Sequence, residues 1–299
     1  MKDIKSLNIL KTLKEQLTSY DYSRFEPLDF HKLDTRFANL TSDPDLAVLD
    51  LYTNSSTIGA GDLFMNGMVG QYQAGTNGRW FRLAEVGASA LVRSNVIQSK
   101  AVDAQFTGMA VLAASIATSG LQTVTVTNGT TTVNATDFAN GSISVYTTPD
   151  LGSDYVITGH TANVTSGGAI TVTLDRYLQN AWTTATKVNM RTNPWKYVIQ
   201  SPATTLTGTP VGVAVFAAAA STVASGATDA NPGQYTWLQT HGVGAVLSDA
   251  TSILVGSQIA VPGGTAGAVT LAVAGLPSVG VAMQAASSTH AISAFLTID

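Results

Sequence analysis

The chain has 299 residues, enough for one to three domains, of which 45% are hydrophobic and only 11% are charged, with a formal net charge of −4. This mild charge argues against nucleic acid or an anionic membrane as a partner. The absence of cysteine excludes disulfides and thiolate metal sites. The longest apolar run, residues 211–220, is about half of what a membrane-spanning helix needs.

The few charges are distributed unevenly along the chain. Seven of the fifteen basic residues lie within residues 1–36, and none follows Lys196. The last hundred residues carry only three acidic side chains, Asp229, Asp249 and Asp299. Because surface charge keeps free proteins soluble, we infer that other subunits cover much of this C-terminal surface.

Residues 1–36 form a separate compositional block, which we expect to be an N-terminal arm. Apolar residues recur there every three or four positions and predict an amphipathic helix: Ile4, Leu7, Leu10, Leu13 and Leu17. Aromatic and charged residues alternate after this helix. The arm packs on its own domain or reaches a neighbouring subunit. For the second interpretation the candidate anchors are Leu7, Leu10, Leu13, Tyr22, Phe25 and Phe30.

Residues 37–120 are predicted to be a β-rich first region. Strands are expected at residues 45–52, 63–72 and 80–86, with a turn at Asn77-Gly78. The apolar run 109–116 is too short for its periodicity to decide between strand and helix.

Residues 121–190 are predicted to form a Thr-rich β-domain, which is a candidate insertion. Val or Ile alternates with Thr or Ser in several short runs, so one face of each strand is apolar. The expected strands are residues 124–127, 142–146, 155–158 and 170–174. Asn128-Gly129 and Asn140-Gly141 are turn signals between them. This spacing is typical of a small sandwich or barrel.

Residues 191–299 are predicted to be a C-terminal β-domain. Short apolar runs broken by Gly, Pro, Ser and Asp predict a compact series of strands and tight turns in residues 233–299. Residues 210–214 recur in part as residues 279–282, and in both copies Gly would let another backbone approach closely. One short echo does not establish a duplication. The fold class expected for the whole chain is mainly β: small β-sandwich or barrel domains with an N-terminal helical and extended arm.

No motif in the sequence predicts catalysis, a metal site or a bound cofactor. His31, His160, His241 and His290 are far apart and never at metal-ligand spacing. Neither a nucleophile elbow nor a phosphate-binding loop is present. An enzyme would need a carboxylate pair assembled by the fold, and nothing in the sequence indicates one. We therefore expect that the chain is not an enzyme and needs no cofactor.

Aromatic residues with basic neighbours would suit a nucleic-acid or glycan contact, and the glycan contact corresponds to an alternative function, an adhesin that binds cell-surface glycan. Trp80, Trp182 or Trp195 would then line an exposed groove. The other interpretation is that these residues belong to strands with an apolar face, or anchor a protein interface, where Trp and Arg are enriched.

Several short motifs resemble a group of tailed-bacteriophage virion structural proteins. They lie at residues 61–67, 193–195, 210–214, 234–242, 246–249, 265–269, 279–282 and 295–299. The resemblance covers residues 60–299 and leaves the arm outside. It implies a capsid decoration (cement) protein, a homotrimer that binds the major capsid protein on the exterior of the phage head and clamps neighbouring capsomers. Such a protein would be in the host cytoplasm during assembly. Under the same resemblance the alternative is a head-fibre or tail-associated adhesin that binds cell-surface glycan. The family supplies no catalytic residues.

Overall fold

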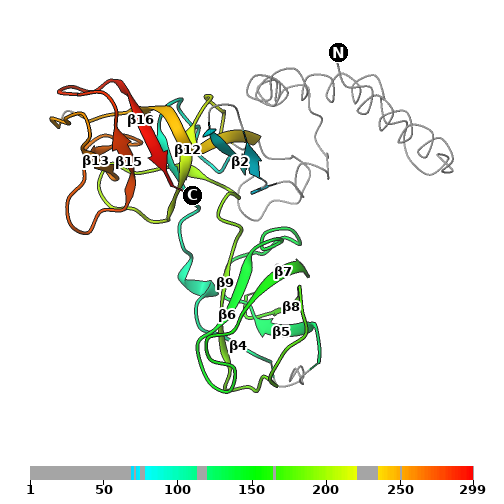
Figure 1. The fold of residues 1–299 in the computed structure, drawn as a ribbon. Helices are drawn as coiled ribbons and strands as arrows, with labels where there is room; N and C mark the ends of the chain where they lie inside the picture. The colour runs from blue at the N-terminus through cyan, green and yellow to red at the C-terminus, as the bar shows by residue number, and fades with distance from the viewer. Residues whose placement is uncertain are drawn as a thin grey trace, which may run out of the picture. The chain divides into compact units, whose positions relative to one another are not determined.

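The structure, a computed structural model, describes residues 69–70, 72–74, 78–112, 120–163, 166–220, 235–249 and 251–298. Their regular structure is almost entirely β, interrupted by short 3-10 turns such as η3 (Ala104–Phe106). This confirms the mainly β fold class, with sheets that curl (Figure 1). The predicted arm, residues 1–36, and the predicted strand at residues 45–52 lie outside the described residues.

The larger sheet is organised around one long strand, β12. Its ten strands are β1 (Tyr72–Ala74), β2 (Trp80–Glu85), β3 (Val96–Gln98), β10 (Ile199–Gln200), β11 (Pro210–Ala214), β12 (Tyr235–Leu247), β13 (Gln258–Ala260), β14 (Thr270–Leu271), β15 (Ser278–Ala282) and β16 (Ala291–Thr297). The main path runs β10-β3-β11-β12-β16-β15-β13-β14. The first half of β12 pairs with β2 and β11, and its second half pairs with β16.

The second sheet has six strands in the order β4-β9-β6-β7-β8-β5. They are β4 (Met109–Ala110), β5 (Thr123–Thr127), β6 (Ser142–Val145), β7 (Asp154–His160), β8 (Ala169–Leu174) and β9 (Lys187–Arg191). A bridge between Val111 and Val126 joins the two edge strands, so the sheet closes into a near-barrel. The predicted alternation is confirmed in β5 and β8, where Val and Ile point into the core and Thr points outward.

The near-barrel lies between β3 and β10 in sequence, so the chain leaves the larger sheet and later returns to it. Its first strand begins at Met109, before the position at which the sequence suggested a boundary. Two hydrogen bonds tie the returning segment to the near-barrel. Lys196 Nζ donates to the Thr136 carbonyl at 2.6 Å, and Tyr197 OH donates to Asp137 Oδ1 at 2.9 Å. The proposed division into domains stays a prediction.

The larger sheet contains an internal duplication. Its first repeat comprises residues 81–87, 89–98, 198–200, 210–218 and 235–241. Its second repeat comprises residues 243–249, 251–260, 269–271, 278–286 and 291–297. The pairing of the strands is the same in both: β3, β11 and the first half of β12 correspond to β13, β15 and β16. β12 is shared, since its first half ends the first repeat and its second half begins the second.

Backbone bonds outside the strands repeat as well. The bridge between Leu91 and Ala218 corresponds to the bridge between Ile253 and Ala286. Two further backbone hydrogen bonds of the first repeat have counterparts in the second. The Ser94 N–H donates to the Ala214 carbonyl as the Gly256 N–H donates to that of Ala282, both at 2.8 Å. The Gly87 N–H donates to the Val198 carbonyl at 2.8 Å, as the Asp249 N–H donates to that of Val269 at 2.9 Å. The short echo seen in the sequence is therefore part of a complete structural repeat.

The repeated glycine has the same role in both copies. Gly212 and Gly280 have φ values of 155° and 157° beside a β-bulge. A Cβ atom would lie 2.7 Å from Leu238 Cβ at the first position and 2.2 Å from the Phe295 carbonyl oxygen at the second. Glycine is thus needed where the neighbouring strand approaches closely, as the sequence predicted.

Candidate functional site

The six predicted anchors of the arm lie outside the described residues. These are Leu7, Leu10, Leu13, Tyr22, Phe25 and Phe30. The hypothesis that they bind a neighbouring subunit stays a prediction, and the candidate site must be sought on the two sheets.

The prediction that Trp182 lines an exposed groove is wrong. Its side chain is fully buried in the near-barrel, and its indole N–H donates to Asp150 at 2.8 Å. Trp195 is half-buried beneath the guanidinium of Arg82, 4.6 Å from the ring centre, and its indole N–H donates to the Val211 carbonyl. Of the three tryptophans considered, Trp80 is the most exposed.

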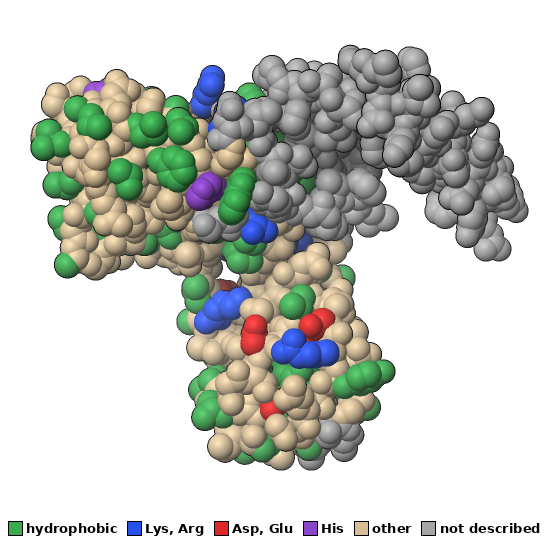
Figure 2. All heavy atoms as spheres, viewed as in Figure 1, with side chains coloured by type: hydrophobic (Ala, Val, Ile, Leu, Met, Phe, Trp, Pro, Cys, Tyr) green, Lys and Arg blue, Asp and Glu red, His purple; other side chains and the backbone are tan. Residues whose placement is uncertain are grey.

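An apolar face of the second repeat is open to solvent. Val243 of β12 lies directly opposite Phe295 of β16, which lies directly opposite Val281 of β15. Paired residues share one face of a sheet, so these three exposed side chains form a row across three adjacent strands. Met283, also exposed, continues this face beyond β15. Figure 2 shows hydrophobic side chains gathered over these strands.

Aromatic rings extend this face toward β2. Trp80 pairs with His241 in register, and their rings stack at a centroid distance of 4.5 Å. The His241 ring in turn meets Phe295 edge-on at 5.2 Å. We call the six side chains of this surface the outer face: Trp80, His241, Val243, Val281, Met283 and Phe295. The ring contacts hold three of them in one arrangement before any partner binds.

The second repeat, which carries most of the outer face, has almost no charged side chains. No basic residue follows Lys196 in the sequence. Within the described residues 235–249 and 251–298 the one acidic side chain is Asp249, which is buried. Its carboxylate accepts the backbone N–H groups of Thr251 at 2.8 Å and Gly264 at 3.1 Å. The outer face therefore suits a partner surface that is itself apolar and uncharged.

The titratable groups of the near-barrel serve its structure. Burial opposes the charge of Asp150 and raises its pKa, but hydrogen bonds outweigh burial and leave the pKa lowered from 3.8. Four side chains donate them: Asn180 and Trp182 at 2.8 Å, Ser153 at 2.9 Å and Tyr155 OH at 3.0 Å. A buried carboxylate with so many donors is held as an ionised structural group rather than as a proton-transfer group.

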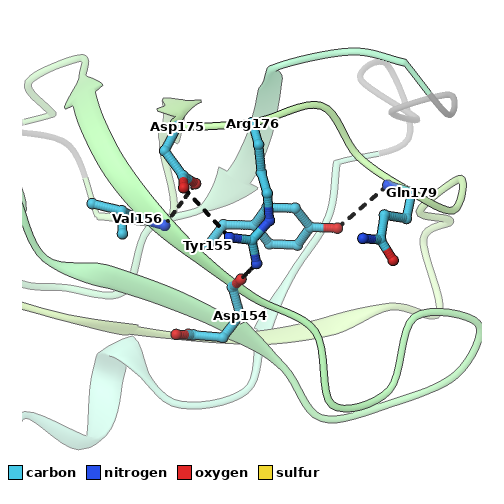
Figure 3. Close-up of polar contacts among 6 residues, drawn as sticks. All are labelled: Asp154, Tyr155, Val156, Asp175, Arg176 and Gln179. Carbon is cyan, nitrogen blue, oxygen red and sulfur yellow. Dashed lines mark hydrogen bonds and ion pairs between the residues drawn. The ribbon is translucent and has the colours of Figure 1, made fainter.

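A second polar cluster connects the start of β7 to the loop after β8 (Figure 3). Asp175 accepts the backbone N–H of Val156 at 2.9 Å and pairs with Arg176 at 3.4 Å. The Arg176 guanidinium also donates to the Asp154 carbonyl and lies over the Tyr155 ring, 4.8 Å from its centre. Each group already has a partner within the cluster, so we assign it a structural role.

His160 joins β7 to a neighbouring turn as a neutral ring. Its Nε2 accepts the backbone N–H of Phe138 at 2.9 Å, while Nδ1 lies 3.0 Å from the Thr161 carbonyl. These contacts require the proton on Nδ1, because Nε2 must accept. Burial lowers the pKa of His160 from 6.5, in agreement with the neutral form.

A cavity of about 720 Å³ lies beside Trp195 and the near-barrel. Its lining includes the charged residues Lys100, Asp103, Asp137 and Arg191. Within the described part of the chain, no group of three or more His, Asp or Glu side chains is placed to hold a metal ion. No helix in that part is long and apolar enough to cross a membrane.

No family model, no curated protein and no solved structure matches this chain. The candidate site therefore depends on geometry alone. Sequence reasoning missed the outer face, for which the alternation in β16 was only a partial signal. Phe295 alternates with buried Ala294 and Leu296, which places a large aromatic side chain on the opposite side of β16 from the core.

Proposed function

We propose that this chain is a structural virion protein, a capsid decoration (cement) protein that stabilises a phage head by bridging capsid subunits. The observation that carries the proposal is the outer face, an exposed apolar and uncharged surface on a rigid β body. Exposed patches of this kind mark interaction sites. The resemblance of several sequence motifs to virion structural proteins supports the same role.

In this proposal the partners are the major capsid protein and further copies of the chain, as a homotrimer, with neither nucleic acid nor membrane. The location is the exterior of the phage head, after assembly in the host cytoplasm. The role is structural rather than catalytic and needs no cofactor. Residues 1–36 attach the body to neighbouring capsid subunits, because that block carries seven of the fifteen basic residues and a helical apolar pattern.

Cement acts by burying apolar surface across seams that internal pressure would open. At about 25 cal/mol per Å², burial of about 200 Å² per contact stabilises the seam by roughly 5 kcal/mol before the entropy of association is subtracted. Repetition of the contact over the shell multiplies this contribution.

The test is co-sedimentation of the purified chain with capsids that lack it. Deletion of residues 1–36 is expected to abolish capsid binding and leave the β body folded. A paired substitution, Leu10→Asp with Leu13→Asp, is expected to weaken binding, while Asn8→Asp with Thr12→Asp, on the polar side of the predicted helix, adds the same charge and serves as its control. Full binding by the truncated chain would contradict this mechanism.

The cavity beside Trp195 favours a second candidate, an adhesin that binds glycan. A mixture of aromatic and charged lining groups suits a sugar. Binding of the purified chain to a glycan array, lost on Trp195→Ala and kept on Trp80→Ala, would support it. Absence of binding to all glycans on the array would count against it.

A further inference from the structure

The duplication provides an internal reference for the outer face. Val243 and Val281 of the second repeat correspond to Phe81 and Val213 of the first. In the first repeat these side chains are 4% and 2% exposed, whereas in the second they are 44% and 39% exposed. The same positions of one structural unit are thus buried in one copy and open in the other.

The second repeat is what covers part of this surface in the first. Val96 and Val213 pack into the hydrophobic core that the second repeat builds. The backbone N–H of Val96 donates to the Gly267 carbonyl at 2.8 Å, and Asn95 Nδ2 donates to the Ala266 carbonyl at 3.4 Å. This face of a repeat is therefore a packing surface, and within the chain the face of the first repeat is already packed in this way.

A repeat at the end of a stack normally presents a polar outer surface, which keeps the stack soluble. The second repeat does not. Phe295 is exposed at the position where the first repeat has Gln239, a polar residue that is buried. The first repeat thus buries a polar residue where the second exposes an apolar one, the opposite of what an end repeat needs. This pattern indicates that a partner covers the outer face.

We propose that copies of this chain meet through the outer face, around the symmetry axis of the homo-oligomer. Away from the edge at Trp80, where Arg79 and Arg82 lie within two residues, the partner must be apolar and uncharged, since residues 197–299 contain no Lys or Arg and the described ones only the buried Asp249. The second repeat of another copy meets this condition, because two such faces bring no like charges together. The inference names the self-contact of the proposed homotrimer and rests on that part of the proposed function.

The test is the mass of the purified chain in solution, without capsids, for wild type and two variants. Wild type is expected to be an oligomer. Phe295→Asp places a charge in the contact and is expected to weaken association by about 30-fold or more, as for a central interface residue. The control Leu151→Asp changes a still more exposed apolar residue of the near-barrel and should leave the mass unchanged. A monomeric wild type, or an unchanged oligomer for Phe295→Asp, would overturn the inference.

Cross-linking decides the matter even if Phe295→Asp does not fold. The chain has no cysteine, so a single introduced thiol is unique. Val243→Cys with a short bis-maleimide should give covalent dimers of the chain, and Leu151→Cys should not. Absence of dimers for Val243→Cys would contradict the self-contact. Capsid binding is measured separately: a monomer that still binds capsids refutes this inference and leaves the proposed function standing.

Discussion

The near-barrel and the second repeat differ in how their exposed apolar residues are arranged. The near-barrel closes on itself through the bridge between Val111 and Val126, and its buried carboxylate Asp150 has four donors. The second repeat shares its core with Val96 and Val213 of the first repeat but leaves Val243, Val281 and Phe295 exposed. The near-barrel also exposes single apolar residues such as Leu151, but the second repeat exposes a row of three across paired strands, a surface that association would bury. The stability of the near-barrel should therefore depend on its own contacts, and the state of the second repeat on concentration.

The largest loss of folding stability is expected on substitution of Asp150, the buried carboxylate of the near-barrel. Asp150→Ala leaves two buried donors, Tyr155 and Trp182, without their acceptor and should lower the free energy of unfolding by about 3 kcal/mol or more. Chemical denaturation followed by circular dichroism measures it. The control Asp154→Asn alters an exposed carboxylate of the neighbouring strand and should stay within about 0.5 kcal/mol of wild type. Equal stability of Asp150→Ala and wild type would refute the structural role of this group.

The next effect concerns the glycine of the duplication. Gly280→Ala places a Cβ 2.2 Å from the Phe295 carbonyl oxygen at a φ of 157° and should cost about 2 kcal/mol or more of folding stability. Gly264 has open space where its Cβ would stand, so Gly264→Ala is the matched control and should change stability little. The melting temperatures of both variants distinguish them. A tolerated Gly280→Ala would mean that β15 and β16 separate more easily than the repeat requires.

A matched pair of substitutions compares the two repeats directly. Val213→Thr buries a hydroxyl in a packed core and should destabilise the chain by about 1–2 kcal/mol. Val281→Thr, at the corresponding position, should leave the stability of the dilute chain within about 0.5 kcal/mol and weaken its self-association. Denaturation at low concentration and sedimentation at high concentration measure the two quantities. Similar loss of folding stability in both variants would remove the contrast between the repeats.

The smallest effect is the dependence of stability on pH through His160. Burial lowers its pKa in the folded chain below 6.5, so the unfolded chain binds the proton first as the pH falls. The contribution is full above pH 6.5 and is lost as the pH falls through the folded pKa. Unfolding free energies of wild type and His160→Gln over this range test it. Gln can accept the Phe138 N–H but does not titrate, so its profile should be flatter.

The near-barrel was predictable from sequence because each of its strands carries its own alternation. In β5 the pattern Thr-Val-Thr-Val-Thr fixes which side is buried without reference to any other strand. Asn140 precedes Gly141 with a φ of 59°, the left-handed conformation that the turn signal implies. Trp182 was misplaced because its burial depends on Asp150, more than thirty residues earlier in the chain, which accepts the indole N–H.

The duplication and the outer face were not predictable in the same way. Equivalent core positions share only apolar character, not size or identity, as in Ala84 with Val246 and Leu238 with Ala294. The near-barrel also interrupts the first repeat between β3 and β10, which hides the common period. The sequence around Phe295 predicts a strand. Which face of that strand is buried is set by its pairing with β12 and β15.

The outer face is the proposed contact surface between copies of the chain. A sedimentation series from about 1 to 100 μM, a range that brackets micromolar association, tests it most directly. We expect an oligomer for wild type that dissociates on dilution, and a monomer for Phe295→Asp across the range. A wild type that stays monomeric at the highest concentration would contradict it.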